Sequence, residues 1–256
     1  MKTLLTSLLL TLVTLTATFA QRTVDARQII DQINQNQSVS YENATITGDL
    51  DLTSLANQRE IRDNGRGNGN EYRSTVTVPL TFRNCVFRGK FLAYRTENEG
   101  RNLFSMNNRV YNADFDEAVT FDNCTFDNDA AFKYSAFRQR AVFVGSKFQN
   151  EALFKYAKFS DMADFSGTQF RGPADFKYTK FGENAAFADA RFTSSADFKY
   201  TKFDDGVTFQ NAHFTGPTDF KYVRFPRRTN LDNVAFDGPS DFKYTTVDGQ
   251  RFSPRN

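Results

Sequence analysis

Phenylalanine recurs along this chain at intervals that alternate between five and six residues, from residue 121 to residue 242. Of the 24 positions in this series through residue 247, 22 are Phe, and the other two are Leu231 and Val247. The triplet Phe-Lys-Tyr follows a longer period, beginning at residues 132, 154, 176, 198, 220 and 242. The repeat is therefore 22 residues long. A fixed period in this range predicts a solenoid, because each copy buries its apolar side only by stacking on its neighbours.

Each Phe is preceded, two residues earlier, by a small residue such as Ala174 or Thr179, and the residue between them is polar or indifferent. Apolar, polar, apolar is the period-two pattern of an extended segment with one buried face. Two or three turn-like residues follow each segment. The pattern predicts very short strands separated by corners, four to a coil, with Phe rings filling a narrow interior.

The segments 174–178 (Ala-Asp-Phe-Lys-Tyr) and 196–200 (the same five residues) resemble the Ala-Asp/Asn-Leu/Phe-x-x motif of pentapeptide-repeat proteins. The resemblance covers residues 110–247 and implies an all-β fold, a right-handed four-sided parallel β-helix. The chain departs from the plain motif by adding one residue to every second unit. Weaker matches to the same spacing are Tyr41, Ile46, Leu52, Phe82, Phe87, Phe104, Val110 and Phe115.

Residues 1–20 are typical of a signal peptide, with Lys2, an apolar stretch over 4–15 and small residues before a cleavage site after Ala20. We therefore expect a secreted or periplasmic protein. No later stretch approaches the ~20 apolar residues of a membrane helix, so no membrane span is expected. The formal net charge of +2 indicates no class of partner.

We expect a helical cap over residues 21–38, because Ile29, Ile30 and Ile33 fall on one helix face. Residues 39–252 are predicted to form the β-helix. Two interruptions, near 56–75 and 92–103, are rich in Arg, Asn, Gly and Glu and are interpreted as loops.

The Gly-Pro pairs at 172–173, 216–217 and 238–239 are interpreted as tight corners, because these residues supply the dihedral angles of turns. After Val247 the tail is short and polar, which predicts a poorly covered last coil. The family resemblance then implies that an end-to-end homodimer can form there.

Cys85 and Cys124 occupy the same inward, small-residue position of their units. Two cysteines in an exported chain are candidates for a disulfide, which requires that they stack on adjacent coils. The interruption near residue 95 leaves their phase open, and one alignment places them on opposite sides. The alternative is that both are small apolar core residues.

The sequence favours a non-enzymatic protein without a cofactor. His213 is the single histidine, which makes a transition-metal site an unfavoured interpretation and a surface position the expected one. The Asp column, for example Asp175 and Asp197, repeats in every coil, so no carboxylate pair is set apart as acid and base. A polysaccharide-active β-helix enzyme remains as a remote alternative.

The clearest candidate for a functional surface is a strip of basic and aromatic residues along one edge, hereafter the Lys/Tyr edge. It contains Lys155, Tyr156, Lys177, Tyr178, Lys180, Lys199, Tyr200, Lys202, Lys221, Tyr222 and Arg224. Basic columns beside an aromatic column can bind an extended anionic polymer, with rings stacking on sugars or bases. For an exported protein an anionic polysaccharide is expected rather than nucleic acid. The alternative is that copying a repeat copies its surface without any ligand.

The two N-terminal loops are a second candidate surface, or else disordered insertions. Their basic and aromatic residues are Arg59, Arg62, Arg66, Tyr72, Arg73, Tyr94, Arg95 and Arg101. Taken together, the sequence predicts an exported structural or protein-interaction module with an unknown protein partner. The alternative is a binder of anionic cell-surface glycans through the Lys/Tyr edge.

Overall fold

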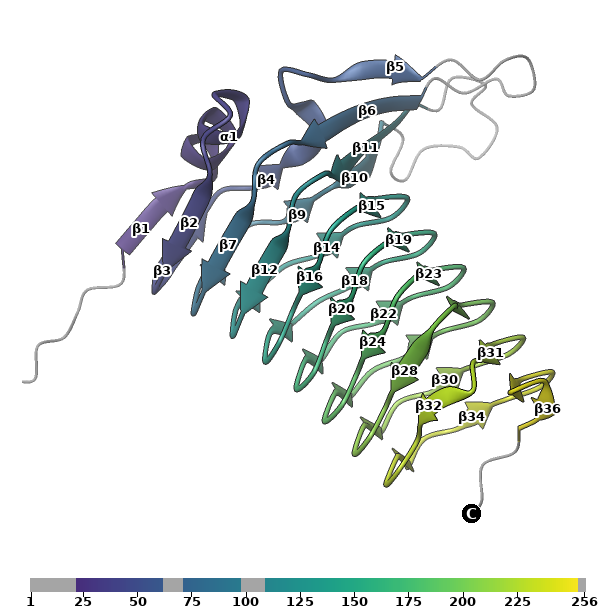
Figure 1. Ribbon diagram of the computed structural model, residues 1–256. Coiled ribbons are helices and arrows are strands. Elements are labelled where there is room, and N and C mark those ends of the chain that lie inside the picture. The colour runs from purple at the N-terminus through teal and green to yellow at the C-terminus, as the bar shows by residue number, and fades with distance from the viewer. Residues whose placement is uncertain (1–21, 62–70, 98–108, 253–256) are drawn as a thin grey trace, which may run out of the picture.

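The chain winds into a solenoid of stacked coils with one short helix at its N-terminal end (Figure 1). The structure, a computed structural model, describes residues 22–61, 71–97 and 109–252. The predicted signal peptide and its cleavage site lie outside these residues. In each coil the chain contributes one short strand to each of four sheets, which we call A, B, C and D. This confirms the predicted four-sided parallel solenoid.

Two of the sheets form one pair of adjoining sides. Sheet A contains β1 (Arg22–Asp25), β3 (Ala44–Thr47), β8 (Val86–Phe87), β13 (Thr125–Phe126), β17 (Lys147–Phe148), β21 (Gln169–Phe170), β25 (Arg191–Phe192), β29 (His213–Phe214) and β33 (Ala235–Phe236). Sheet B contains β2 (Val39–Glu42), β7 (Leu80–Arg83), β12 (Val119–Asp122), β16 (Ala141–Val142), β20 (Ala163–Asp164), β24 (Ala185–Ala186), β28 (Gly206–Thr208) and β32 (Arg228–Asn230).

The other two sheets complete the square. Sheet C contains β4 (Leu50–Asp51), β9 (Phe91–Leu92), β14 (Ala130–Ala131), β18 (Ala152–Leu153), β22 (Ala174–Asp175), β26 (Ala196–Asp197), β30 (Thr218–Asp219) and β34 (Ser240–Asp241). Sheet D contains β5 (Arg59–Ile61), β6 (Glu71–Val76), β10 (Tyr94–Thr96), β11 (Val110–Phe115), β15 (Ala136–Phe137), β19 (Lys158–Phe159), β23 (Lys180–Phe181), β27 (Lys202–Phe203), β31 (Arg224–Phe225), β35 (Thr246–Val247) and β36 (Gln250–Arg251).

Phe rings fill the interior in columns that run along the solenoid. Phe154 stacks on Phe176 at a centroid distance of 5.0 Å, and Phe176 stacks on Phe198 at 4.9 Å, with planes within 6° of parallel. Rings of neighbouring columns meet edge to face, as Phe154 and Phe165 do at 5.3 Å. Both geometries are favoured for aromatic pairs and add to the free energy gained by burial. The interior is therefore ordered along two directions by ring packing.

The small residue that precedes many of these Phe residues has a second role at the corner. The Thr179 hydroxyl donates to the Phe154 carbonyl of the previous coil at 2.7 Å, and Thr201 donates to Phe176 in the same way. Both hydroxyls are buried, so these bonds satisfy polar groups that would otherwise be costly. The same bond is available to other Thr residues at this inward position, whereas the buried Ser135 hydroxyl has no hydrogen-bond partner.

The glycines of the Gly-Pro corners are required by close approach. A Cβ on Gly172 would lie 2.3 Å from the Asn150 carbonyl oxygen of the previous coil, and one on Gly216 would lie 2.1 Å from that of Ser194. Neither residue has a positive φ. The dihedral reason expected from the sequence is therefore wrong, and contact between coils replaces it.

The helix α1 (Ala26–Asn34) covers the first coil as expected, with Ile29 and Ile33 buried. The Asp25 carboxylate begins it by accepting a hydrogen bond from the Arg27 amide at 2.9 Å. The helical cap expected over residues 21–38 is shorter, because residues 22–25 form β1 and the helix ends at Asn34. That strand pairs in parallel with β3 and extends sheet A beyond the first coil.

The insertions begin and end as strands rather than as loops. After the short 3-10 helix η1 (Leu52–Ser54), β5 pairs antiparallel with β6, and β10 pairs antiparallel with β11. β6 and β11 also pair in parallel with each other over six residues. The result is two stacked arms that extend from sheet D at the N-terminal end of the solenoid (Figure 1).

The last coil is better covered than the sequence suggested. β36 turns back antiparallel to β35, and the Phe252 ring packs edge to face on Phe242 at 5.3 Å. Leu231, Val234 and Phe236 nevertheless stay partly exposed at this end. The end-to-end homodimer stays a prediction.

Replacing Phe176 with Asp is expected to unfold the domain, because a carboxylate in this column would lie among aromatic rings with no partner. The expected loss in free energy of unfolding exceeds about 4 kcal/mol. The Phe176→Leu variant is the control and should lose roughly 1 to 2 kcal/mol. Thermal unfolding followed by circular dichroism measures both. An unchanged midpoint for Phe176→Asp would contradict the buried column.

Candidate functional site

The structure brings the Lys/Tyr edge together at the corner between sheets C and D. Asp175 lies on β22 of sheet C, Lys177 and Tyr178 form the turn that follows, and Lys180 begins β23 of sheet D. The next two coils repeat this order, and in the last coil Thr246 takes the place of the basic residue. The predicted residues of the edge therefore form adjacent columns on one corner, with the Asp column on the C side and a basic column on the D side.

The tyrosines of the edge have an unusual backbone conformation. Tyr134, Tyr156, Tyr178, Tyr200, Tyr222 and Tyr244 all have φ between 60° and 63°. The matching turn position between sheets B and A holds residues that tolerate this left-handed region well, namely Gly145, Gly167, Asp189, Asn211 and Asn233. A tyrosine there costs of order 1 kcal/mol or more in backbone strain. The turn itself therefore does not explain why Tyr is used in all six coils.

The tyrosine rings stack on one another. Tyr156, Tyr178 and Tyr200 follow at centroid distances of 4.8 and 4.9 Å, with planes within 3° of parallel. Their faces are covered by neighbouring rings, so the column presents ring edges and hydroxyl groups to solvent. The expectation that these faces stack on sugars or bases is wrong for the middle of the column. Tyr244, which ends it, is 56% exposed.

The lysines of the turn lie over the same rings. The Nζ atoms of Lys155, Lys177 and Lys199 lie 5.4 to 5.7 Å from the centroid of the following tyrosine, within cation–π range. Lys221 instead pairs with Asp219 at 3.0 Å and Asp241 at 3.3 Å. These two carboxylates raise the pKa of Lys221, so it stays cationic. The column keeps its positive charge close to the aromatic edges.

The Asp column has a structural role in every coil from Asp175 onwards. One carboxylate oxygen of Asp175 accepts from the Lys177 amide at 2.9 Å, and that of Asp197 accepts from the Lys199 amide at 2.8 Å. Burial, and next the neighbouring Asp of the column, raise the pKa of Asp175 and Asp197. The hydrogen bond from the lysine amide and the charges of nearby lysines lower the pKa of these two carboxyl groups. These carboxylates therefore cap turns and are unremarkable as catalytic groups.

A groove runs along the D side of the tyrosine column, with a volume of about 830 Å³. We call it the D-side groove. It is lined by Tyr178, Tyr200, Thr201, Lys202, Phe203, Asp204, Tyr222, Arg224, Tyr244 and Thr246. The repeat pattern predicts that several of these residues lie on the edge, but it contains no signal for a hollow between the ring edges and sheet D.

Both insertion arms leave the solenoid at this same corner. The first arm, β5 and β6, follows β4 of sheet C, and the second arm, β10 and β11, follows β9 of sheet C. Tyr94 of β10 contacts Tyr134 at a centroid distance of 5.9 Å, and its hydroxyl lies 3.1 Å from the Lys133 amine. The insertion thus adds one more ring to the column. Through Tyr94, the described part of the second arm therefore adjoins the Lys/Tyr edge.

Aromatic and ionic contacts hold the arms together. Tyr72 and Tyr111 stack at 5.0 Å, and the Arg95 guanidinium lies 4.0 Å from the Tyr111 ring centroid. The buried Asp114 carboxylate lies 3.5 Å from Arg73 and 3.7 Å from Arg138 of the neighbouring coil. Arg59 is in β5, whereas Arg62, Arg66 and Arg101 lie outside the described residues. The described part of the arms is therefore structured.

The two cysteines stack on adjacent coils. The pairing of Val86 with Thr125 puts Cys85 and Cys124 in register at the corner between sheets B and A, both fully buried. Each thiol also has its own acceptor, the Tyr41 carbonyl for Cys85 and the Phe82 carbonyl for Cys124. Their mutual hydrogen bond lowers the pKa of Cys85 to about 7 and, with burial, raises that of Cys124. The phase left open by the sequence is settled, and the disulfide stays a prediction.

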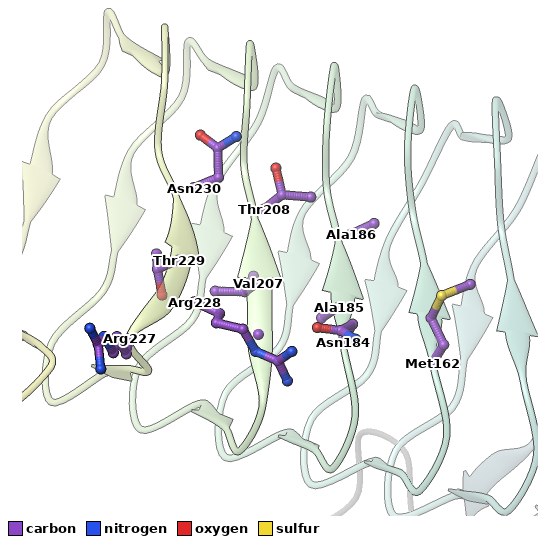
Figure 2. A pocket seen from close by; sticks show the side chains of 11 residues that line it. Met162, Asn184, Ala185, Ala186, Val207, Thr208, Arg227, Arg228, Thr229 and Asn230 are labelled. Carbon is purple, nitrogen blue, oxygen red and sulfur yellow. The ribbon is translucent and has the colours of Figure 1, made fainter.

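Two other features are weaker candidates. His213 lies on β29 and its Nε2 atom is 2.6 Å from an Asp237 carboxylate oxygen. Within residues 22–61, 71–97 and 109–252, no three His, Cys, Asp or Glu side chains are grouped to hold a metal ion. A depression of about 500 Å³ lies on sheet B and is lined by Met162, Arg227 and Arg228 together with smaller side chains (Figure 2). Arg228 pairs with Asp205.

Comparison with known proteins agrees with the fold. The family described as pentapeptide repeats (9 copies) matches residues 111–157, 154–202 and 198–246, more than half of the chain. The chain belongs to the pentapeptide-repeat family. No curated protein and no solved structure shows a significant match. Among the described residues no helix is long and apolar enough to cross a membrane.

Replacing Asp197 with Asn should stabilise the protein at neutral pH. Asn keeps an oxygen that can accept from the Lys199 amide and removes a partly desolvated charge. Folding raises the pKa of Asp197, so the folded protein favours the protonated side chain. The contribution of Asp197 to stability is therefore fully present below its unfolded pKa and is lost as the pH rises through its folded pKa. The Asn variant should therefore gain in thermal midpoint at pH 7 and lose that gain in acid.

The Asp197→Ala variant is the matched control, because it removes the acceptor together with the charge. It is expected to lose roughly 1 kcal/mol, or about 2 to 4 °C, from the missing hydrogen bond. Thermal midpoints of the three proteins across the acid range give the comparison. An Asn variant less stable than the parent at pH 7 would show that the carboxylate charge is favourable.

If Cys85 and Cys124 form a disulfide in the oxidised protein, the intact mass falls by two hydrogen atoms and a thiol reagent labels neither residue after unfolding. Neighbouring strands lie ~4.8 Å apart, within the Cα separation of disulfides. Reduction should then lower the thermal midpoint, since the bridge closes the loop that contains β10 and β11. Two labelled thiols in air-oxidised protein would favour the core-residue alternative, with Cys85→Ala as the labelling control.

Proposed function

We propose that the protein is an exported, non-enzymatic interaction module that binds its partner through the Lys/Tyr edge. The observation that supports it is the use of tyrosine at a strained turn position in every coil from Tyr134 to Tyr244. Export rests on residues 1–20, which carry the signal-peptide pattern. The rest of the proposal depends on what the side chains of this edge present to solvent.

The internal copies of the repeat argue that the edge is under a constraint beyond duplication. On sheet A the outward position before the Phe varies freely, through Thr125, Lys147, Gln169, Arg191 and His213. The turn between sheets B and A also varies. By contrast, the turn between sheets C and D has Lys followed by Tyr in six successive coils, from residue 133 to residue 244, although both side chains face outward. Copies that have diverged elsewhere have kept these two side chains.

The repetition supports binding rather than catalysis. Six coils present the same Lys and Tyr, and the last four of them also present the same Asp. Acid–base or nucleophilic catalysis instead needs one arrangement of different groups in a concave site. A surface with the same groups in each coil is suited to a partner that is itself extended. An enzyme acting on polysaccharides would instead require a single carboxylate whose replacement abolishes turnover.

An anionic cell-surface glycan is the second candidate, as the specific ligand of this module. Charge favours it. Ten Lys and Arg side chains of the Phe-Lys-Tyr turns and of the outward sheet-D column lie beside four Asp of sheet C and Asp204 of the groove, a local excess of five positive charges. Such an excess concentrates polyanions near the surface in a manner that weakens with salt.

Retention of the purified protein on immobilised heparin tests this candidate. We expect retention that weakens with salt and is reduced when Lys177 and Tyr178 are both replaced by Ala. The matched control replaces Lys147 and Gln169 on sheet A by Ala, which removes the same charge. Equal loss in both variants would contradict a role for the edge. Absence of retention by the parent would reject the glycan and leave a protein partner as the proposed ligand.

A further inference from the structure

We propose that the D-side groove holds an extended anionic polysaccharide that runs parallel to the solenoid axis, with acidic groups against Lys202 and Arg224 of two successive coils. This inference rests on the proposed function and specifies the ligand class, its position and its direction. The edges and hydroxyls of the tyrosine column form one wall of the groove. Lys202, Asp204 and Arg224 lie on its other side.

The groove contains cations that the protein itself leaves without a carboxylate. In the part of the chain that the structure describes, Lys202 and Arg224 form no ion pair, and both side chains are exposed. Asp204, the one carboxylate among the groove's lining residues, pairs instead with Lys180 of the previous coil at 3.0 Å. Lys202 and Arg224 are paired in register on neighbouring strands of sheet D and lie side by side, one coil apart. An anionic group of a ligand therefore gains most electrostatic stabilisation beside Lys202 and Arg224, where it does not compete with a carboxylate of the protein.

The spacing of these groups sets the direction of the ligand. Parallel pairing places Lys158, Lys180, Lys202 and Arg224 in one column, each one coil from the next. Adjacent coils are ~4.8 Å apart, the separation of neighbouring strands. One sugar residue of an extended polysaccharide has a length close to this step. A chain with an acidic group on successive sugars can therefore meet successive cations only when it lies along the axis.

The tyrosine stack distinguishes a polysaccharide from a single-stranded nucleic acid. Single strands bind by stacking bases on exposed aromatic faces above a basic groove. Here Tyr178, Tyr200 and Tyr222 cover one another at 4.9 and 4.6 Å, so their faces are closed to bases. What remains is a row of phenolic hydroxyls, which donate to and accept from sugar hydroxyls.

The experiment measures binding of heparin fragments of increasing length, from the disaccharide upward, to the full mature protein at several salt concentrations. One variant carries Lys202→Gln and Arg224→Gln. Its matched control carries Lys147→Gln and Arg191→Gln, two cations of sheet A. Thermal midpoints confirm that both remain folded. Neither variant touches Lys177 or Tyr178, so the groove is tested separately from the turn.

We expect affinity to rise with fragment length and then level off. The groove variant should bind roughly three- to tenfold more weakly than the parent, while the control keeps the parent affinity. The slope of log affinity against log salt should fall by roughly 1.5 to 2 in the groove variant alone, as for two lost phosphate-type contacts.

Four results would overturn the inference. Equal weakening in the groove variant and the control would show attraction by charge alone. An affinity independent of fragment length would reject the axial direction. Single-stranded DNA that competes as well as heparin would reject the polysaccharide. If the groove variant binds like the parent while Lys177→Ala with Tyr178→Ala abolishes binding, the edge stands as proposed and only the groove is rejected.

Discussion

Stacking of phenylalanine rings between successive coils is the interaction on which the rest of this structure depends. Each ring of a column lies about 5 Å from the next, as between Phe176 and Phe198. For the rings to meet, every coil must have the same length and phase. The insertions keep this rule by leaving the solenoid at a corner and returning in register, so that Phe115 still stacks on Phe137 at 4.7 Å.

A regular interior produces a regular surface, and this determines how function must be read from it. Any outward residue repeated in the sequence becomes a column, so a column alone says little. The tyrosines differ, because they occupy a left-handed turn position. The matching position of the turn between sheets B and A is occupied by residues that tolerate this conformation, such as Gly167 and Asn211. The tyrosine side chains stack on one another, lie within cation–π distance of the lysine amines and border the D-side groove. The insertion arms add Tyr94 to the same edge, which extends it towards the N-terminus.

The sequence was sufficient where the period is unbroken. The spacing around Phe154, Phe176 and Phe198 predicted the strands, the corners and the buried columns. It was insufficient wherever a property depends on contacts between coils. The phase of Cys85 and Cys124 could not be counted across an insertion. The closed faces of the tyrosine stack and the groove beside Lys202 arise from the coil spacing and not from any local pattern. The strand β1 had no apolar period to reveal it.

The most direct test of this account is to delete one coil in phase and to compare it with a deletion one residue shorter. Removing residues 174–195 deletes one repeat of 22 residues and joins Pro173 to Ala196, as one copy follows another. Removing 174–194 shifts every later ring out of its column. Thermal unfolding should show one cooperative transition for the first variant and loss of folding beyond the junction for the second. Equal stability of the two variants would contradict coil-on-coil stacking as the basis of the fold.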